Sequence, residues 1–174
     1  MTAAQFGLVS HDRLRVILVT VIGSLLLGFL HWLNLRRMGS MQNPAMEKFR
    51  DLARKLLPQS PIEFLPYSAL AITAGICEEF IFRGFAIGAL DRAGWNVILI
   101  VIFTSVLFGL AHAYQGRGGI VGTTLIGVLF AVGRLAYHSL VPVIVWHAVL
   151  DLVAGAAGSR YLLRDVQKYA EIHE

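Results

Sequence analysis

The chain is organised around residues 77–84, whose sequence is CEEFIFRG. This stretch places three formal charges inside an apolar segment that extends over residues 65–90. A charged side chain near the centre of a bilayer costs at least ~2.5–3.5 kcal/mol on insertion scales. Three such side chains therefore indicate either partners that offset this cost or a function that requires the charges. Helical spacing offers part of that compensation. Glu79 and Arg83 stand at i and i+4 with the acid first, and we expect them to form an ion pair.

Glu78 is the carboxylate that this pairing leaves without a partner on its own helix. It lies about 100° around the helix from Glu79, and its i+4 neighbour is the uncharged Phe82. A carboxylate in an apolar environment without a local cation is suited to act as a general base or acid near neutral pH. The alternative interpretation is that the three charges form a structural cluster that only joins helices together.

The composition identifies an integral membrane protein. Of the 174 residues, 56% are hydrophobic and 15% are charged, which is too apolar for an ordinary soluble domain. The single cysteine, Cys77, excludes an intrachain disulfide framework and a Cys-rich metal site. We expect Cys77 to be an inert residue buried among apolar neighbours rather than a nucleophile. The net charge of +4 is placed beside apolar runs, so the expected partner is the lipid bilayer and not nucleic acid.

The apolar runs predict an all-α fold, a polytopic transmembrane helix bundle of about five spans. A span needs about 20 apolar residues, and the fourth run is short, so we expect it to pack inside the bundle. We interpret the first run as a retained transmembrane helix, because no small-residue cleavage site of a signal peptide follows it. The runs cover residues 16–35, 65–90, 97–113, 120–135 and 141–156.

The long polar stretch between the first two spans contains a further predicted helix, over residues 44–57. It starts with Asn43-Pro44, a favourable N-terminal signal. Its apolar residues recur at helical spacing and its other face is basic, which predicts an amphipathic helix lying on the bilayer surface. A solvated linker helix is the alternative. The apolar positions are Met46, Phe49, Leu52, Ala53 and Leu56.

We therefore expect three parts: residues 1–60 with the first span and the basic amphipathic loop, residues 61–158 as the membrane core, and residues 159–174 as a charged tail. Lys and Arg are more frequent on one side of the predicted membrane, which predicts that this side, with the C-terminus, is cytoplasmic. That side holds the 36–55 loop, Arg117, Arg160, Arg164 and Lys168.

Polar side chains also interrupt the third and fifth spans. His112 ends the third, and the fifth carries His147 and Asp151, which share a helix face at i and i+4. Together with Glu78, these groups can satisfy one another around a wet cavity. The set permits hydrolysis. Glu78 and His112 would hold and deprotonate a water, and His147 would donate a hydrogen bond to the developing oxyanion. Asp151 would orient His147, or donate if protonated.

A metal site uses the same kinds of side chain. Glu78, His112 and His147 would bind zinc with an open coordination position. The His-Glu-x-x-His motif of common zinc proteases is absent from the sequence. The residues alone therefore leave open a cofactor-free mechanism and a zinc-dependent one.

Three motifs in this order, each on its own apolar run, resemble the CPBP family of CAAX-processing and bacteriocin-processing enzymes, which are intramembrane endopeptidases. They are Glu78-Glu79-x-x-x-Arg83, Phe108-x-x-x-His112 and His147-x-x-x-Asp151. The resemblance covers residues 61–157. It implies that Glu78 and His112 activate water, that His147 and Asp151 stabilise the oxyanion, and that Glu79 and Arg83 give structural support. It also implies a glutamate-type protease with no cofactor, with zinc as the alternative.

The expected function is cleavage of a membrane-associated peptide or protein substrate, such as a C-terminal sorting signal or an exported peptide, in the inner membrane of a prokaryotic cell. The CAAX-processing branch often carries Asn where this chain has Asp151, and this chain is short. Both features disfavour prenylated CAAX substrates. The alternatives are a non-catalytic immunity or assembly factor of the same fold, and a proton- or metal-transporting bundle.

Overall fold

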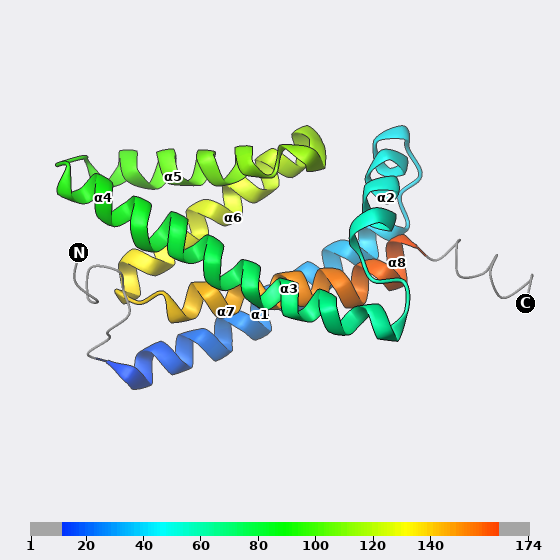
Figure 1. Ribbon diagram of the computed structural model, residues 1–174, viewed down its shortest axis with the longest axis horizontal. Helices are drawn as coiled ribbons and strands as arrows, with labels where there is room; N and C mark the ends of the chain where they lie inside the picture. The colour runs from blue at the N-terminus through cyan, green and yellow to red at the C-terminus, as the bar shows by residue number, and fades with distance from the viewer. Residues whose placement is uncertain (1–11, 164–174) are drawn as a thin grey trace, which may run out of the picture. The chain divides into compact units, whose positions relative to one another are not determined.

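The computed structural model describes residues 12–163, and every regular element in this range is a helix, which confirms the all-α prediction (Figure 1). Arg164 and Lys168, which contributed to the predicted orientation, lie outside the described residues. The helices are α1 (Arg13–Gly39), α2 (Pro44–Leu56), α3 (Pro61–Glu79), α4 (Ile87–Arg92), α5 (Val97–Ala111), α6 (Gly116–Tyr137), α7 (Val141–Val153) and α8 (Ser159–Leu162). Two π-helical segments, η1 (Phe80–Ala86) and η3 (Ala154–Gly158), and one short 3₁₀ turn, η2 (Ala113–Gln115), complete the set.

Three helices of the described chain are long and apolar enough to cross a membrane. They cover Arg13–Gly39, Ala113–Tyr137 and Val141–Leu162. The prediction of five spans is not confirmed. The third predicted span is an apolar helix of 15 residues, α5, and the second carries its charges in α3 and η1.

The described residues form two compact units. Unit 1 comprises residues 12–23 and 74–147, and unit 2 comprises residues 24–73 and 148–163. The helices α1, α3 and α7 contribute residues to both units.

In unit 1, α5 and α6 pack against each other along their length (Figure 1). Gly109 permits this contact, because a Cβ there would come within 2.8 Å of the Ile120 carbonyl oxygen. Gly116 opens α6 with a φ of 78°, a left-handed conformation that favours glycine. The helix therefore starts four residues before the predicted apolar run, which begins at residue 120.

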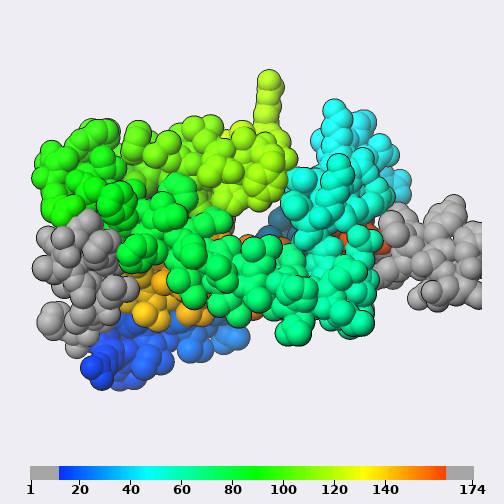
Figure 2. All heavy atoms as spheres, in the orientation of Figure 1, coloured from blue at the N-terminus to red at the C-terminus, as the bar shows by residue number. Residues whose placement is uncertain are grey.

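The side chain of Trp146 on α7 joins three helices of unit 1. Its indole Nε1–H donates to the Thr20 carbonyl of α1 over 3.2 Å. Gly23 and Gly133 leave room for the ring, since a Cβ at either position would lie within 3.0 Å of indole carbon atoms. The first half of α1 exposes apolar side chains on its other surface, and the blue spheres of Figure 2 show this part of α1 at the surface of the molecule. Such a run of exposed apolar side chains fits contact with lipid. They are Leu14, Ile17, Leu18, Val21 and Ile22.

In unit 2, α2 confirms the predicted helix after residue 43. The Asn43 side chain accepts a hydrogen bond from the Met46 backbone N–H over 2.9 Å, which caps the helix, and Pro44 occupies its first turn. The apolar face of α2 packs partly on the protein itself, whereas Leu56 remains 50% exposed. The buried cluster contains Leu35, Met46, Ala53, Ala157, Leu162 and Leu163.

Candidate active site

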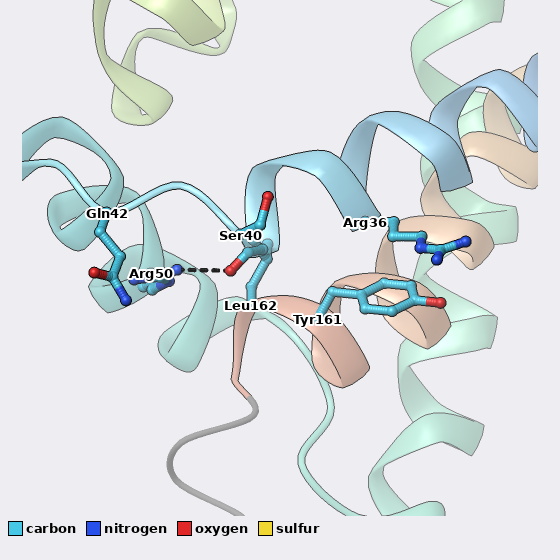
Figure 3. A pocket seen from close by; sticks show the side chains of 7 residues that line it. Arg36, Ser40, Gln42, Arg50, Tyr161 and Leu162 are labelled. Atoms are coloured by element: carbon cyan, nitrogen blue, oxygen red, sulfur yellow. Dashed lines mark hydrogen bonds between the residues drawn. The ribbon is translucent and has the colours of Figure 1, made fainter.

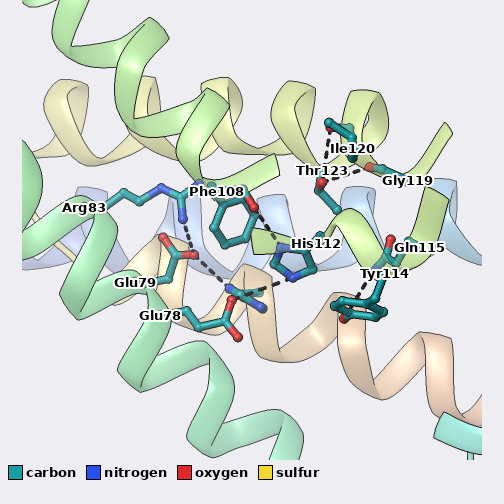
Figure 4. A network of polar contacts seen from close by, with 11 residues as sticks. Glu78, Glu79, Arg83, Phe108, His112, Tyr114, Gln115, Gly119, Ile120 and Thr123 are labelled. Atoms are coloured by element: carbon teal, nitrogen blue, oxygen red, sulfur yellow. Dashed lines mark hydrogen bonds and ion pairs between the residues drawn. The ribbon is translucent and has the colours of Figure 1, made fainter. Parts of the chain in front are cut away.

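Glu79 and Arg83 form the buried centre of the candidate site in unit 1. Glu79 ends α3 and Arg83 lies in η1, and both side chains are fully buried. Arg83 Nη1 donates to Glu79 Oε1 over 2.9 Å (Figure 4), so the predicted i,i+4 ion pair is present. A buried pair of this kind needs further polar partners to offset the loss of water.

The backbone of α6 supplies one such partner. Arg83 Nη2 donates to the Gly127 carbonyl oxygen over 3.3 Å. A Cβ at Gly127 would stand 3.2 Å from Arg83 Nη2 and 3.1 Å from the Cα of Ser105. Glycine at position 127 therefore lets the guanidinium and α5 approach α6 closely.

Aromatic rings enclose the same guanidinium. Arg83 Cζ lies 4.1 Å from the centre of the Phe108 ring, 5.7 Å from Phe82 and 5.6 Å from Phe130. Each distance is within the range of a cation–π interaction, which is strongest where water is excluded. These contacts fix the position of Phe108, whose own backbone takes part in the site.

Glu79 has a second partner that the sequence did not indicate. Its Oε1 lies 2.8 Å from Nδ1 of His147, 68 residues further along the chain. An ionised carboxylate only accepts, so Nδ1 of His147 carries the hydrogen. The ring can then donate from Nε2 when the imidazole is protonated. Glu79 and Arg83 thus orient His147 as well as pairing with each other, and we name these three residues the closed half of the site.

His112 follows the last residue of α5 and is oriented by that helix. Its Nδ1 lies 2.8 Å from the Phe108 carbonyl oxygen, an acceptor, so Nδ1 carries the hydrogen and Nε2 keeps its lone pair. The Phe108 and His112 rings also lie 4.7 Å apart, centre to centre. Nε2 is directed at Glu78, with 3.8 Å between His112 Nε2 and Glu78 Oε2 (Figure 4).

Glu78 and His112 form the open half of the site. Their side chains are 33% and 14% exposed, whereas Glu79 next in sequence is fully buried. Glu78 Oε2 has no hydrogen-bond partner among the described residues. The 3.8 Å separation is too long for a direct hydrogen bond, and Oε2 itself is buried although the Glu78 side chain is partly exposed.

Asp151 lies one turn after His147 on α7, as the sequence predicts, but belongs to unit 2. Its backbone carbonyl accepts a hydrogen bond from the Tyr67 hydroxyl over 2.9 Å. The structure thus gathers Glu78, Glu79, Arg83, His112 and His147 within unit 1 and describes Asp151 with the other unit. In unit 1, Glu79 orients His147. The role that the sequence analysis gave to Asp151, to orient His147 or to donate if protonated, stays a prediction.

Two further observations concern the predicted chemistry. Within residues 12–163, no three His, Cys, Asp or Glu side chains stand close enough together to hold a metal ion. Zinc binding by Glu78, His112 and His147 stays a prediction. The prediction that Cys77 is buried was wrong, because the thiol is exposed on the surface of α3. Helical spacing turns it away from the faces that carry its acidic neighbours.

Gly127 and Phe130 of α6 belong to the site and were not predicted. The signal that pointed to them was weak. The small residues between 120 and 135 indicated a helix inside the bundle, without indicating what it would contact. The π-helical geometry of η1 also has no marker in the sequence. Such segments are frequent at functional sites.

The protein has long apolar helices and a network of buried polar side chains. These two features identify the class of protein as an integral membrane protein with a polar site among its helices. Residues 59–153, more than half of the chain, match the family of type II CAAX prenyl endopeptidase Rce1-like proteins. The chain belongs to this family, which is a family of proteases, and the resemblance drawn from the three motifs is confirmed. Comparison with curated proteins and with solved structures gave no match.

Proposed function

We propose that the protein is a glutamate-type intramembrane endopeptidase in which Glu78 and His112 activate the attacking water. The observation that carries this proposal is the open half of the site. Glu78 Oε2 and His112 Nε2 face each other across 3.8 Å, and both atoms are acceptors. We place the attacking water beside this pair, where it would donate one hydrogen to each atom and keep a lone pair for attack on a carbonyl carbon.

In the proposed reaction, Glu78 takes a proton from the water as the oxygen bonds to the carbonyl carbon of the scissile peptide. The carbonyl oxygen becomes an oxyanion. The tetrahedral intermediate then breaks its C–N bond, and the protonated Glu78 returns the proton to the leaving nitrogen. The products are a carboxyl terminus and an amino terminus, and Glu78 is ionised again. General acid–base catalysis of this kind contributes about 10²–10⁴-fold in rate.

The closed half of the site would stabilise the oxyanion. Glu79 holds Nδ1 of His147, so a protonated ring offers Nε2–H to the developing charge. Arg83 balances the charge of Glu79. The positive charge of a protonated His147 ring is therefore available to match the negative charge of the oxyanion. Asp151 follows one turn later on α7, and by the family motif we assign it to the oxyanion side as well.

No step of this mechanism passes through a metal. We expect cleavage by the purified protein to survive extended treatment with a zinc chelator. The control is a zinc protease handled in the same detergent, which should lose its activity. Loss of cleavage here, restored by adding zinc, would contradict the cofactor-free mechanism.

We further propose that five segments cross the bilayer, with the charged helix 61–92 and α5 in addition to the three long apolar helices. The basic side would be cytoplasmic, in the inner membrane of a prokaryotic cell. A site inside these helices suits a substrate that is itself held in the membrane, such as a C-terminal sorting signal or an exported peptide. A prenylated CAAX peptide is the substrate that the name of the matching family describes.

The test is substrate trapping in the native membrane. Wild type and Glu78→Gln are expressed at equal abundance, and membrane proteins are compared by mass spectrometry. A precursor that accumulates only in Glu78→Gln would support proteolysis and identify the substrate. Glu47→Gln on α2, which makes the same chemical change at an exposed position, is the matched control and should process normally. An unchanged set of precursors with an intact phenotype would favour the non-catalytic immunity or assembly factor.

A further inference from the structure

A polar pocket lies in unit 2, and none of the residues that line it is assigned to proteolysis. It has a volume of about 380 Å³ and is formed where α1 ends, with contributions from α2 and α8 (Figure 3). Its lining is rich in hydrogen-bond donors and contains no acidic side chain. The residues are Arg36, Gly39, Ser40, Gln42, Arg50, Tyr161 and Leu162.

Three of these donors, the side chains of Arg36, Gln42 and Tyr161, have no hydrogen-bond partner among residues 12–163. The Arg36 guanidinium stacks over the Trp32 ring at 5.7 Å and makes no hydrogen bond or ion pair there. The Tyr161 hydroxyl is likewise without a hydrogen-bond partner in the described part of the chain. Figure 3 shows both side chains extending to the same side of the pocket. A stacked guanidinium keeps its N–H edges available for an anion.

Arg50 and Ser40 of the pocket are already engaged. Arg50 Nη2 donates to the carbonyl oxygens of Gly39 and Met41, over 3.0 and 2.9 Å. The Ser40 hydroxyl donates to the Arg37 carbonyl over 2.8 Å. These bonds tie down the backbone between α1 and α2. The loop is thereby shaped before any ligand arrives, and the side chains of Arg36, Tyr161 and Gln42 remain available to bind it.

The position along the chain indicates what that ligand is. Arg36 directly follows the long apolar run of α1, a helix long enough to span a bilayer, so its guanidinium stands at the level where lipid headgroups begin. α2, which contributes Arg50 to the pocket, also carries Lys48 and Arg54. A basic pocket at the end of a span is suited to the phosphate of a negatively charged lipid.

We propose that this pocket binds the phosphate group of an anionic phospholipid, through the Arg36 guanidinium and the Tyr161 hydroxyl. The same chemistry would accept a soluble phosphate, and the experiment separates the two sources. The proposal does not depend on the protease activity, because its readout is lipid binding.

The test is native mass spectrometry of the full-length protein in detergent, supplied with equal amounts of phosphatidylglycerol and phosphatidylcholine. We expect preferential retention of phosphatidylglycerol. Arg36→Gln should lower that retention about tenfold, as expected for the loss of one charge-assisted contact. Tyr161→Phe should lower it less. Arg37→Gln is the matched control, since Arg37 is the next residue, equally charged and exposed, and does not line the pocket.

Three results would overturn the proposal. Equal losses in Arg36→Gln and Arg37→Gln would show that general surface charge attracts the lipid. Equal retention of the two lipids by the wild type would show that no anion is recognised. Displacement of phosphatidylglycerol by an excess of inorganic phosphate would identify a soluble phosphate as the ligand and reject the lipid.

Discussion

The two halves of the candidate site begin at adjacent residues and have opposite surroundings. In the closed half, Glu79, Arg83 and His147 are 0–8% exposed and are joined by hydrogen bonds of 2.8–2.9 Å. In the open half, Glu78 and His112 are 33% and 14% exposed and stand 3.8 Å apart. Glu79 therefore holds two other side chains through its Oε1, whereas the carboxylate of Glu78 makes only the 3.8 Å contact with His112. The difference suggests a division between a part that fixes geometry and a part that reacts.

Glu78→Gln should show the largest difference between the two halves, because it should affect cleavage strongly and stability hardly at all. We expect cleavage of the trapped precursor to fall about 10²–10⁴-fold, because the amide cannot take the proton from water. Stability should hardly change, since Glu78 Oε2 makes no hydrogen bond with the described residues. Cleavage rate and thermal unfolding are measured on the same preparation. Full cleavage activity in purified Glu78→Gln protein would contradict the proposed role of the open half.

Arg83→Met should affect stability instead. It would leave Glu79 charged and buried without its guanidinium, at a cost of about 3–5 kcal/mol in the free energy of unfolding. Denaturant unfolding in micelles gives this quantity. Arg92→Met, at an exposed position at the end of α4, is the control and should change it little. If both variants unfold alike, the closed half does not hold the site together.

Gly127→Ala tests the close approach of α6 to the closed half. The added methyl group would press on Arg83 Nη2 and the Ser105 backbone, and we expect a loss of about 1–3 kcal/mol in stability. Gly122→Ala is a matched control on the same helix, because a Cβ there meets nothing within 4 Å. Alanine favours the helix, so this control should be neutral or up to about 1 kcal/mol more stable. The difference between the two unfolding free energies isolates the packing effect.

Cys77→Ser should have the smallest effect, although Cys77 is bonded directly to Glu78. Its thiol is exposed and belongs to neither half of the site. We expect cleavage within about twofold of the wild type and a stability change within about 0.5 kcal/mol. A large loss of cleavage with normal folding would mean that the thiol takes part in the reaction.

The features that could be predicted from the sequence are the local ones. The Glu79–Arg83 pair depends on one turn of helix, and the cap at Asn43 depends on three residues. Both are confirmed, since neither requires knowledge of the rest of the fold. The start of α2 followed from Pro44 for the same reason.

Contacts between distant segments could not be predicted in this way. The bond from His147 to Glu79 joins residues 68 positions apart, and the bond from Arg83 to Gly127 joins residues 44 apart. Their charge and position in apolar helices indicated that these side chains have polar partners. The sequence was compatible with several different pairs among them. The sequence shows Asp151 on the same helix face as His147, and from that position it predicts that Asp151 orients His147 or donates if protonated, without indicating Glu79 as a partner.

The number of spans shows a different limit. Apolar runs were counted as spans, and this treated the 15-residue α5 and the charged α3–η1 segment in the same way as α1. A run shows that a segment avoids water. It does not show whether lipid or protein takes the place of that water.

The π-helical segment η1 has one further consequence. A π turn holds more residues than an α turn, so η1 shifts the angular phase of the helix between Glu79 and Ile87. Each end thereby keeps its own direction: Glu79 contacts His147, and Ile87 packs with Ile100 and Ala131. Removing a single residue from 80–86 would rotate one end by about 100° relative to the other. The length of this segment is thus as strict a requirement as its charged residues. A one-residue deletion would disturb the contact of Glu79 with His147 or the packing of Ile87 against Ile100 and Ala131.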